Sequence, residues 1–268
     1  MAKSVFYFGG QEAGLLGTFH MPSRLQRRNA VVVLCNPLSE EANRAHRVYR
    51  VIAAQLERQG YSTLRFDYRC TGDSLGEEAD ARLGDWVEDV VTAAGEATQR
   101  AGVGRVVLCG VRLGGTLAAL AAASGHLRVR QLVLWDPVVE GRAHLRDLSE
   151  THVTFLREEL SPDRARLLRN TEMPTEYLGQ PLSAALRASL AAIDLAATEP
   201  GADRTTIVRT RITPDQQRLE DAWRDRPGVN FQDVVAGDSW NSDAALNAAT
   251  VPAEVVRAIT NCIEEQNS

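Results

Sequence analysis

The chain has 268 residues, of which 44% are hydrophobic and 24% charged, and a net charge of −5. The length suffices for one large domain with its own core, and the composition is that of a soluble globular protein. The negative charge, without a basic stripe, argues against nucleic acid as a partner. No apolar run approaches the roughly eighteen residues that span a bilayer, and the first residues lack a signal-peptide pattern.

The four cysteines show neither the spacing of a metal site nor that of a disulfide framework; they are Cys35, Cys70, Cys109 and Cys262. We therefore expect a reduced, cytoplasmic protein that holds no metal and no cofactor.

Short apolar runs alternate with amphipathic helical segments over most of the chain, which predicts a mostly parallel sheet with helices on both faces. Residues 4–8 and 14–20 are expected to open the fold as a hairpin. The other predicted elements are strands over 30–35, 62–67, 105–109, 131–135, 205–212 and 229–235, helices around Val48–Leu56 and Trp86–Ala94, a helix after 114, and a last helix over 253–265.

The alternation stops between about residues 141 and 198. This stretch is helical in pattern, rich in Arg, Glu and Leu, and interrupted by three prolines. Because it is longer than a single crossover needs, we interpret 141–198 as a helical lid inserted into a core formed by 1–140 and 199–268.

Residues 110–114 read Gly-Val-Arg-Leu-Gly, which is the frame of a G-x-S-x-G nucleophile elbow with Arg112 in place of the serine. A strand precedes it and a small-residue helix follows, as the motif requires. The two glycines are expected because the turn brings backbones too close for a Cβ. Arginine cannot attack a carbonyl at any ordinary pH, so the usual chemistry of the motif is excluded.

With these features, the chain resembles the α/β-hydrolase superfamily over nearly its whole length, which implies an eight-stranded sheet. Residues 66–74 are similar to the D-x-R-G-x-G-x-S loop of serine-aminopeptidase-like hydrolases, with Cys70 at the first glycine. Residues 37–43, 112–114 and 134–141 resemble hydrolases found alongside exosortase and exopolysaccharide systems. That group also carries an arginine at the nucleophile position, so the resemblance implies that this arginine is a recurring variant. It does not indicate which substrate is bound.

The catalytic histidine of this fold should follow the last strand, yet no histidine occurs after His152. The corresponding loop, 237–241, instead supplies Trp240 as a candidate ligand contact. The acid could be Asp215 or Asp136, and either could equally be a helix N-cap or a salt-bridge partner. Asp136 precedes Pro137, which should hold it extended and directed toward the lid.

An oxyanion hole needs only backbone N–H groups, here those of Leu38 and Leu113, since Pro37 has none. Arg112 either pairs with a carboxylate, with Glu40, Glu41, Asp73 and Asp136 as candidates, or grips an anionic ligand group.

Four further side chains have alternative interpretations. Cys70 is either a thiol nucleophile or a small side chain packed in the interior. The packing role is favoured because no histidine near it in sequence could lower the pKa of the thiol. His46, on the first crossover helix, either faces the pocket mouth or lies at the surface, and the surface is favoured. His144 and His152 lie in the predicted lid, from which either could reach down as an acid or base.

Two main functions follow from these residues, and residual hydrolysis by Cys70 or an activated water is a weaker third. The first is an enzyme, in a biosynthetic pathway, that binds an anionic or acyl small molecule under the lid and performs non-serine chemistry. Its candidate catalytic residues are Arg112, Asp136, Glu40 and Cys70, and its candidate ligand contacts are Leu38, Leu113, Glu41, Asp215 and Trp240. The second is a non-catalytic pseudo-hydrolase that binds a ligand or partner. We expect a small-molecule, acyl or peptidyl ligand and consider a homodimer.

Overall fold

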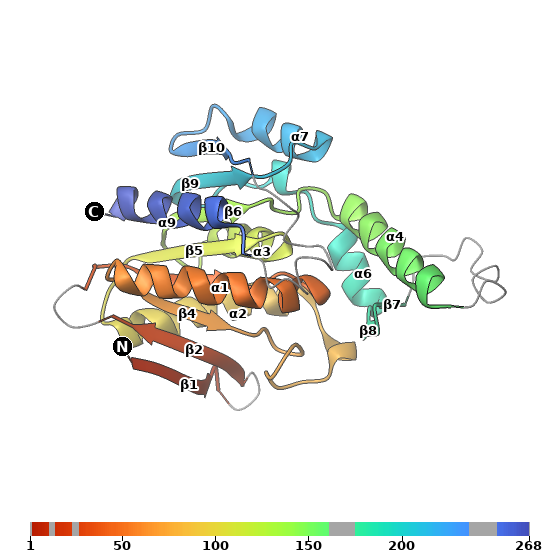
Figure 1. The fold of residues 1–268 in the computed structure, drawn as a ribbon, viewed down its shortest axis with the longest axis horizontal. Coiled ribbons are helices and arrows are strands. Elements are labelled where there is room, and N and C mark those ends of the chain that lie inside the picture. The colour runs from red at the N-terminus through yellow and green to blue at the C-terminus, as the bar shows by residue number, and fades with distance from the viewer. Residues whose placement is uncertain (1, 11–13, 23–26, 161–174, 236–250, 268) are drawn as a thin grey trace.

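The computed structural model describes residues 2–10, 14–22, 27–160, 175–235 and 251–267 (Figure 1). Within them, one eight-stranded sheet forms the centre of the molecule, as predicted. Its strands are β1 (Ala2–Phe8), β2 (Leu15–Met21), β3 (Val31–Cys35), β4 (Ser62–Phe66), β5 (Val106–Val111), β6 (Val129–Trp135), β9 (Ala202–Arg209) and β10 (Val229–Asp233).

The sheet has the order β1-β2-β4-β3-β5-β6-β9-β10. The opening hairpin β1–β2 is antiparallel, and β2 also runs antiparallel to β4. All other neighbours are parallel. The mostly parallel sheet predicted from the alternation of elements is therefore confirmed.

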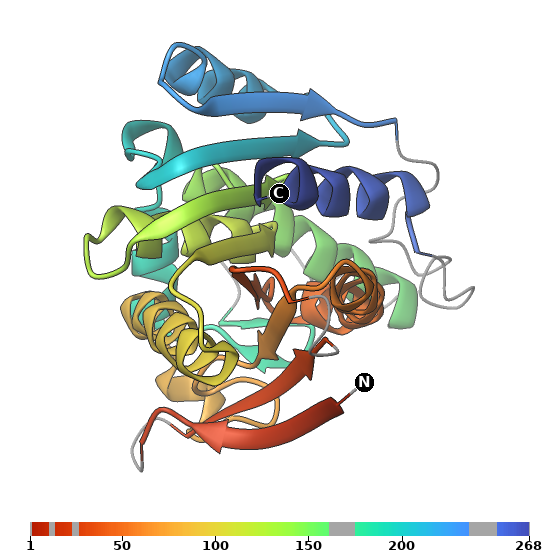
Figure 2. The same cartoon turned by 90° about the vertical axis from the view of Figure 1, so that its left-hand side faces the viewer.

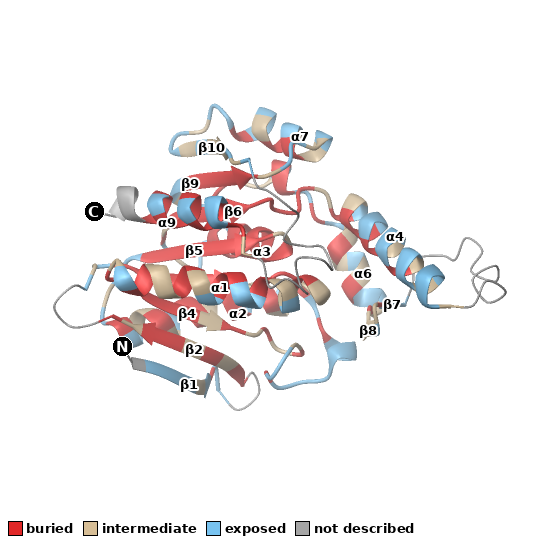
Figure 3. Ribbon diagram, in the orientation of Figure 1, coloured by how far each residue is buried: buried red, intermediate tan, exposed pale blue. Residues whose placement is uncertain are grey.

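Helices cover both faces of the sheet, so its central strands are buried on both sides (Figures 2 and 3). In β3, Val31 and Val33 belong to one core cluster and Val32 and Leu34 to the other. Strands buried in this way read as continuous apolar runs, which is why they were easy to predict. On one face lie α1 (Glu40–Arg58) and α9 (Ala253–Asn267), and on the other α2 (Leu83–Ala101) and α3 (Leu113–Ala123).

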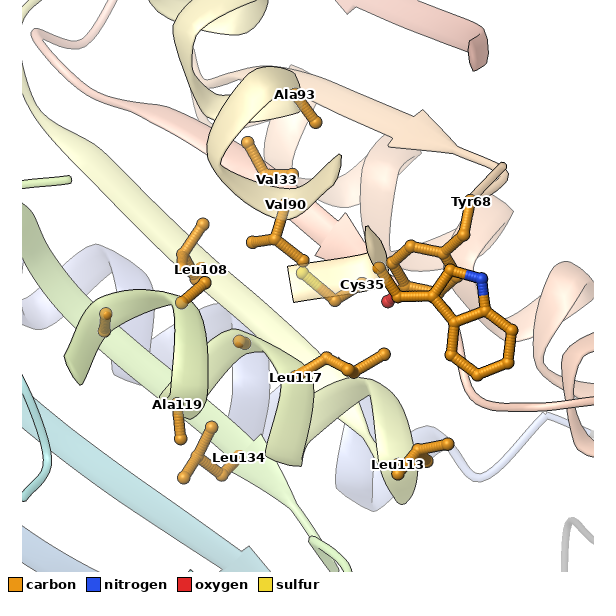
Figure 4. Close-up of a cluster of buried hydrophobic side chains, with 14 of the residues drawn as sticks. Val33, Cys35, Tyr68, Val90, Ala93, Leu108, Leu113, Leu117, Ala119 and Leu134 are labelled. Atoms are coloured by element: carbon orange, nitrogen blue, oxygen red, sulfur yellow. The ribbon is translucent and has the colours of Figure 1, made fainter. Parts of the chain in front are cut away.

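The core on the second face reaches the start of α3. Figure 4 shows Leu113 and Leu117 of α3 and Val90 of α2 among the side chains packed with Val33 and Leu108 of the sheet. This packing fixes the end of the sheet at which the elbow lies. None of the described helices is long and apolar enough to cross a membrane.

The segment between β6 and β9 lies beyond the carboxyl ends of the central strands (Figure 1). Its helices α4 (Gly141–Glu159) and α6 (Ala184–Ala191) agree with the helical pattern of the sequence, and η3 (Leu195–Ala197) is a single short turn. The sequence did not predict the small hairpin of β7 (Glu176–Tyr177) and β8 (Gln180–Pro181). Its turn places Leu178 at φ 47° beside Gly179 at φ 87°, and leucine is not a turn-forming residue.

A second helix–strand unit completes the sheet edge: α7 (Pro214–Trp223) connects β9 to β10. A short turn, η2 (Glu78–Asp80), lies between β4 and α2.

The elbow glycines stand where backbones meet. A Cβ on Gly114 would lie 2.1 Å from the carbonyl oxygen of Cys35 and 2.4 Å from that of Asn36. A Cβ on Gly110 would lie 2.4 Å from backbone atoms of Gly114. The prediction that the turn excludes side chains at both positions is confirmed.

We expect Gly114→Ala to lower the free energy of unfolding by about 3 kcal/mol, because backbone oxygens cannot move aside for the new methyl group. Gly95→Ala is the matched control: Gly95 lies in α2, and a Cβ there would meet no atom within 4 Å, so the change should raise stability by about 0.5–1 kcal/mol. Urea unfolding measures both, and equal effects of the two substitutions would contradict the close approach at Gly114.

Candidate functional site

Arg112 occupies the nucleophile position with the strained backbone of an elbow, at φ 53° and ψ −127°. Its N–H donates to the carbonyl oxygen of Trp135 at 2.9 Å, which ties the turn to β6. Its Nε donates to Oε1 of Glu41 at 3.0 Å, and the two side chains are only 14% and 7% exposed. Of the four carboxylates considered from the sequence, Glu41 is the partner.

The surroundings of Arg112 are rich in negative charge. Burial opposes its charged form, but Glu41, with Asp136 and Asp147 farther away, outweighs burial and raises the pKa of the guanidinium. Arg112 is therefore a fixed cation whose charge is already offset inside the protein. An anionic ligand at this position would have to approach three carboxylates.

A cavity of about 360 Å³ lies beside the elbow, where β3, β4 and β5 end. The loop after β3 and the first turns of α1 form one wall, the loop after β4 a second, and the β7–β8 hairpin with α6 a third. Leu38, Leu113 and Cys70 line it, whereas Arg112, Glu40, Glu41, Asp136 and Asp215 are not among its described lining residues. The sequence-predicted residues thus fall into two groups.

Leu38 and Leu113 come together because the turn before α3 packs directly on the end of β3, as the contacts of Gly114 require. Within the described residues, neither backbone N–H donates a hydrogen bond. An oxyanion hole requires backbone donors of this kind that are not bonded within the protein.

Asp136 does not face the cavity. It has φ 42°, so the prediction of an extended backbone was wrong, and its N–H donates to the carbonyl oxygen of Val208 at 2.9 Å. Its carboxylate accepts hydrogen bonds from the N–H of Thr210 at 2.9 Å and from the Thr210 hydroxyl. The backbone pairing with β9 overrides the preference that Pro137 imposes.

Asp215 lies at a helix start, and Glu40 has a local partner. Asp215 lies in the first turn of α7, where Thr213 is the N-cap and accepts from the N–H of Gln216 at 3.2 Å, in agreement with the helix-start interpretation. Glu40 lies 3.5 Å from Arg44, one turn along α1. Trp240 lies outside the described residues.

The thiol of Cys70 reaches the cavity but is almost wholly buried. Burial raises its pKa, and the nearby Asp80 and Asp85 raise it further, so the thiol stays protonated at neutral pH. These surroundings favour a packing role for Cys70 over that of a nucleophile.

Sequence reasoning undervalued two polar residues of the cavity wall, His46 and Asp67. His46 is exposed, as favoured from the sequence, and it also lines the cavity, which was the alternative placement. Asp67 follows β4 directly and accepts hydrogen bonds from Asn36 Nδ2 at 3.2 Å and from the N–H of Asp73 at 3.3 Å. Its position after a strand at the carboxyl edge of the sheet was the available signal.

The two histidines of α4, His144 and His152, have different surroundings. His152 accepts a hydrogen bond at Nδ1 from the N–H of Leu178 at 3.1 Å and so joins α4 to the hairpin. His144 is buried near Arg112, and neither ring nitrogen has a partner among the described residues. Burial, with Arg112 adding to it, lowers the pKa of His144 to about 3.

Replacing either member of the Arg112–Glu41 pair leaves a buried charge without its partner, so Arg112→Ala and Glu41→Ala should each lower stability by about 3–5 kcal/mol. The double variant should lose less than the two single losses combined, by about 1–3 kcal/mol. Arg58→Ala, at an exposed position of α1, is the control and should change stability by less than about 0.5 kcal/mol. Additive losses in chemical denaturation would show that the two side chains do not interact.

The neutral state of His144 predicts a loss of stability in acid. Its folded-state pKa of about 3 lies below its ordinary value of 6.5, so between these values the unfolded chain binds the proton that the folded protein does not. From this residue we expect a loss of about 2 kcal/mol between pH 6.5 and 5. His144→Leu should remove that part of the pH dependence, whereas His126→Gln, at an exposed histidine, should keep it. Thermal unfolding against pH measures both, and an unchanged slope in His144→Leu would refute the prediction.

Comparison with known proteins agrees with this architecture. The family model for serine aminopeptidase, S33, matches residues 26–191. No curated protein matches the chain in sequence.

Solved structures share the fold at low sequence identity. Est1E from Butyrivibrio proteoclasticus, with ferulic acid bound, is 18% identical with a TM-score of 0.67, over 97% of this chain and 98% of its own. The enol-lactonase from Burkholderia xenovorans is 16% identical, with a TM-score of 0.59 over 95% and 98%. Mouse alpha/beta hydrolase domain-containing protein 10 is 16% identical, with a TM-score of 0.59 over 98% and 99%. The chain is therefore an α/β-hydrolase-fold protein and belongs to the serine aminopeptidase S33 family.

Proposed function

We propose that this protein is an enzyme that binds an acyl-bearing small molecule in the 360 Å³ cavity and acts on it without a serine nucleophile. The observation that carries the proposal is the pair of free amides, Leu38 and Leu113, at one cavity beside an elbow whose side chain is paired with Glu41. Such amides stabilise negative charge that develops on a carbonyl oxygen. The oxygen of the bound acyl group would accept from both.

The charge of the cavity favours an acyl ligand over an anionic one. Asp67, Asp73 and Glu78 line it, and its described lining contains neither arginine nor lysine. An anion would be repelled by these carboxylates, whereas an uncharged or cationic acyl compound would not.

We propose that residues 141–198 act as the lid of this site and that 1–140 and 199–268 form the core. Support comes from Tyr177 and Gln180 of the hairpin and from Leu186 of α6, which line the cavity. A place in a biosynthetic pathway, a cytoplasmic location and a homodimer stay predictions from the sequence.

The Arg112–Glu41 pair supports a second candidate, a pseudo-hydrolase that binds the same ligand without converting it. In that case the buried ion pair fills the space of the former nucleophile, and the cavity serves for recognition alone. The two functions differ in whether a bound acyl compound is recovered unchanged.

Proline at position 38 tests the amide directly, because it removes the N–H that would hold the carbonyl oxygen. With a panel of uncharged esters, thioesters, lactones and amides followed by mass spectrometry, Leu38→Pro should lower turnover by about 100-fold or more, while Leu38→Ala keeps the N–H and most of the activity. Thermal unfolding of both variants checks that they fold. Equal turnover in the two would overturn the role of this amide, and compounds that raise the melting temperature but return unchanged would favour the pseudo-hydrolase.

Reaction with a fluorophosphonate, which labels activated serines, tests the absence of serine chemistry. We expect no adduct on the wild-type chain, because neither the elbow nor the region after His152 supplies the serine–histidine pair. A stoichiometric adduct on any serine would contradict the proposal.

A further inference from the structure

The cavity contains a proton acceptor that neither the elbow nor the predicted catalytic residues supply. Its titratable lining residues are His46, Asp67, Asp73, Glu78, Tyr68, Tyr177 and Cys70. Tyr68 donates its hydroxyl to the carbonyl oxygen of Asn36 at 3.0 Å. Burial, with Glu41 nearby, raises the pKa of Tyr177 to about 12, and the Cys70 thiol is protonated as well. These three groups cannot accept a proton at neutral pH.

His46 is suited to accept one. It lies on the face of α1 that also presents Ala42 and Asn43 to the cavity. Within the described part of the chain, the side chain of His46 shows no hydrogen bond, and it is exposed at the cavity. Partial burial, Arg65 of β4 and Arg50 of α1 lower the pKa of His46, and Asp67 opposes them. The imidazole is therefore neutral at pH 7.

Asp67 is held in place on the cavity wall formed by the loop after β4. Asn36 Nδ2 donates to one carboxylate oxygen at 3.2 Å and the N–H of Asp73 to the other at 3.3 Å. A Cβ on Gly72 would lie 2.5 Å from Oδ2, so the loop closes tightly around the carboxylate. Asp67 interacts electrostatically with His46 and favours its charged form.

We infer that His46 is the general base of this acyl site and that Asp67 stabilises its protonated form, an inference that rests on the proposed function. The C–H bond next to the acyl carbonyl breaks, and the proton moves to a ring nitrogen of His46. The electron pair forms an enolate, whose oxygen accepts from the amides of Leu38 and Leu113. Return of the proton restores the carbonyl compound, so the step needs neither an oxidant nor a nucleophile.

The reaction predicts exchange of the hydrogen next to the carbonyl with solvent. In D₂O, the wild-type protein should add deuterium at that carbon to at least one compound of the panel, seen as a mass increase and located by NMR. His46→Gln should lower the exchange rate by about 100-fold or more, the usual contribution of a general base. His126→Gln is the matched control, because His126 is exposed and outside the cavity lining.

Asp67→Asn tests whether the charge of Asp67 stabilises protonated His46 or whether Asp67 only supports the structure of its loop. In the wild type, exchange should rise with pH to a plateau with its midpoint below 6.5, because burial, Arg65 and Arg50 lower the pKa of His46. Removal of the Asp67 charge withdraws support for the imidazolium, so the midpoint should move to still lower pH. A slower rate with the midpoint unchanged would refute the role of Asp67.

The outcomes distinguish a failure of His46 as the general base from a failure of the proposed acyl site. Exchange that is lost in Leu38→Pro but retained in His46→Gln overturns His46 as the base and leaves the acyl site standing. Exchange retained in Leu38→Pro counts against the acyl site itself. Oxygen-18 from water in a product, with no deuterium at carbon in any compound, shows hydrolysis and overturns proton abstraction from carbon. No exchange and no turnover in any compound also overturns the inference.

Discussion

The close approach of Gly114 to the carbonyl oxygens of Cys35 and Asn36 is the constraint on which the site depends. It presses the start of α3 onto the end of β3, so the loop that carries Leu38 and the first turn that carries Leu113 share one cavity. A side chain at position 114 would separate these two segments. The shared position of these two amides is therefore a consequence of backbone packing and does not depend on the side chain at position 112.

Arginine at the elbow changes the electrostatics of the neighbourhood without entering the cavity. The guanidinium is drawn to Glu41 on α1, and the two charges offset each other in a region that water scarcely reaches. The cavity is left with carboxylates and one neutral histidine. Any chemistry there then belongs to the wall formed by α1 and the loop after β4, away from the usual nucleophile position.

Much of the fold could be predicted from the sequence, because strands buried on both faces are continuous apolar runs and the helices have an apolar face with regular spacing. The close packing at the elbow glycines could also be predicted, because the spacing of Gly110 and Gly114 is that of a turn with no room for a Cβ. Less predictable were features set by partners distant in sequence. Asp136 has a positive φ because it bonds to β9, more than 70 residues away, and the β7–β8 hairpin turns at a leucine.

The candidate site divides in the same way. By itself, the sequence determined that arginine stands at position 112, that no histidine follows His152, that Leu38 and Leu113 could offer amides, and that Arg112 would need an anionic partner. Only the tertiary structure decided that the carboxylate is Glu41, that Glu40 and Asp136 have partners outside the cavity, and that His46 and Asp67 line it together. The physical reason is that residue types are local properties of a chain, whereas the partner of a charge depends on which helix packs beside which strand.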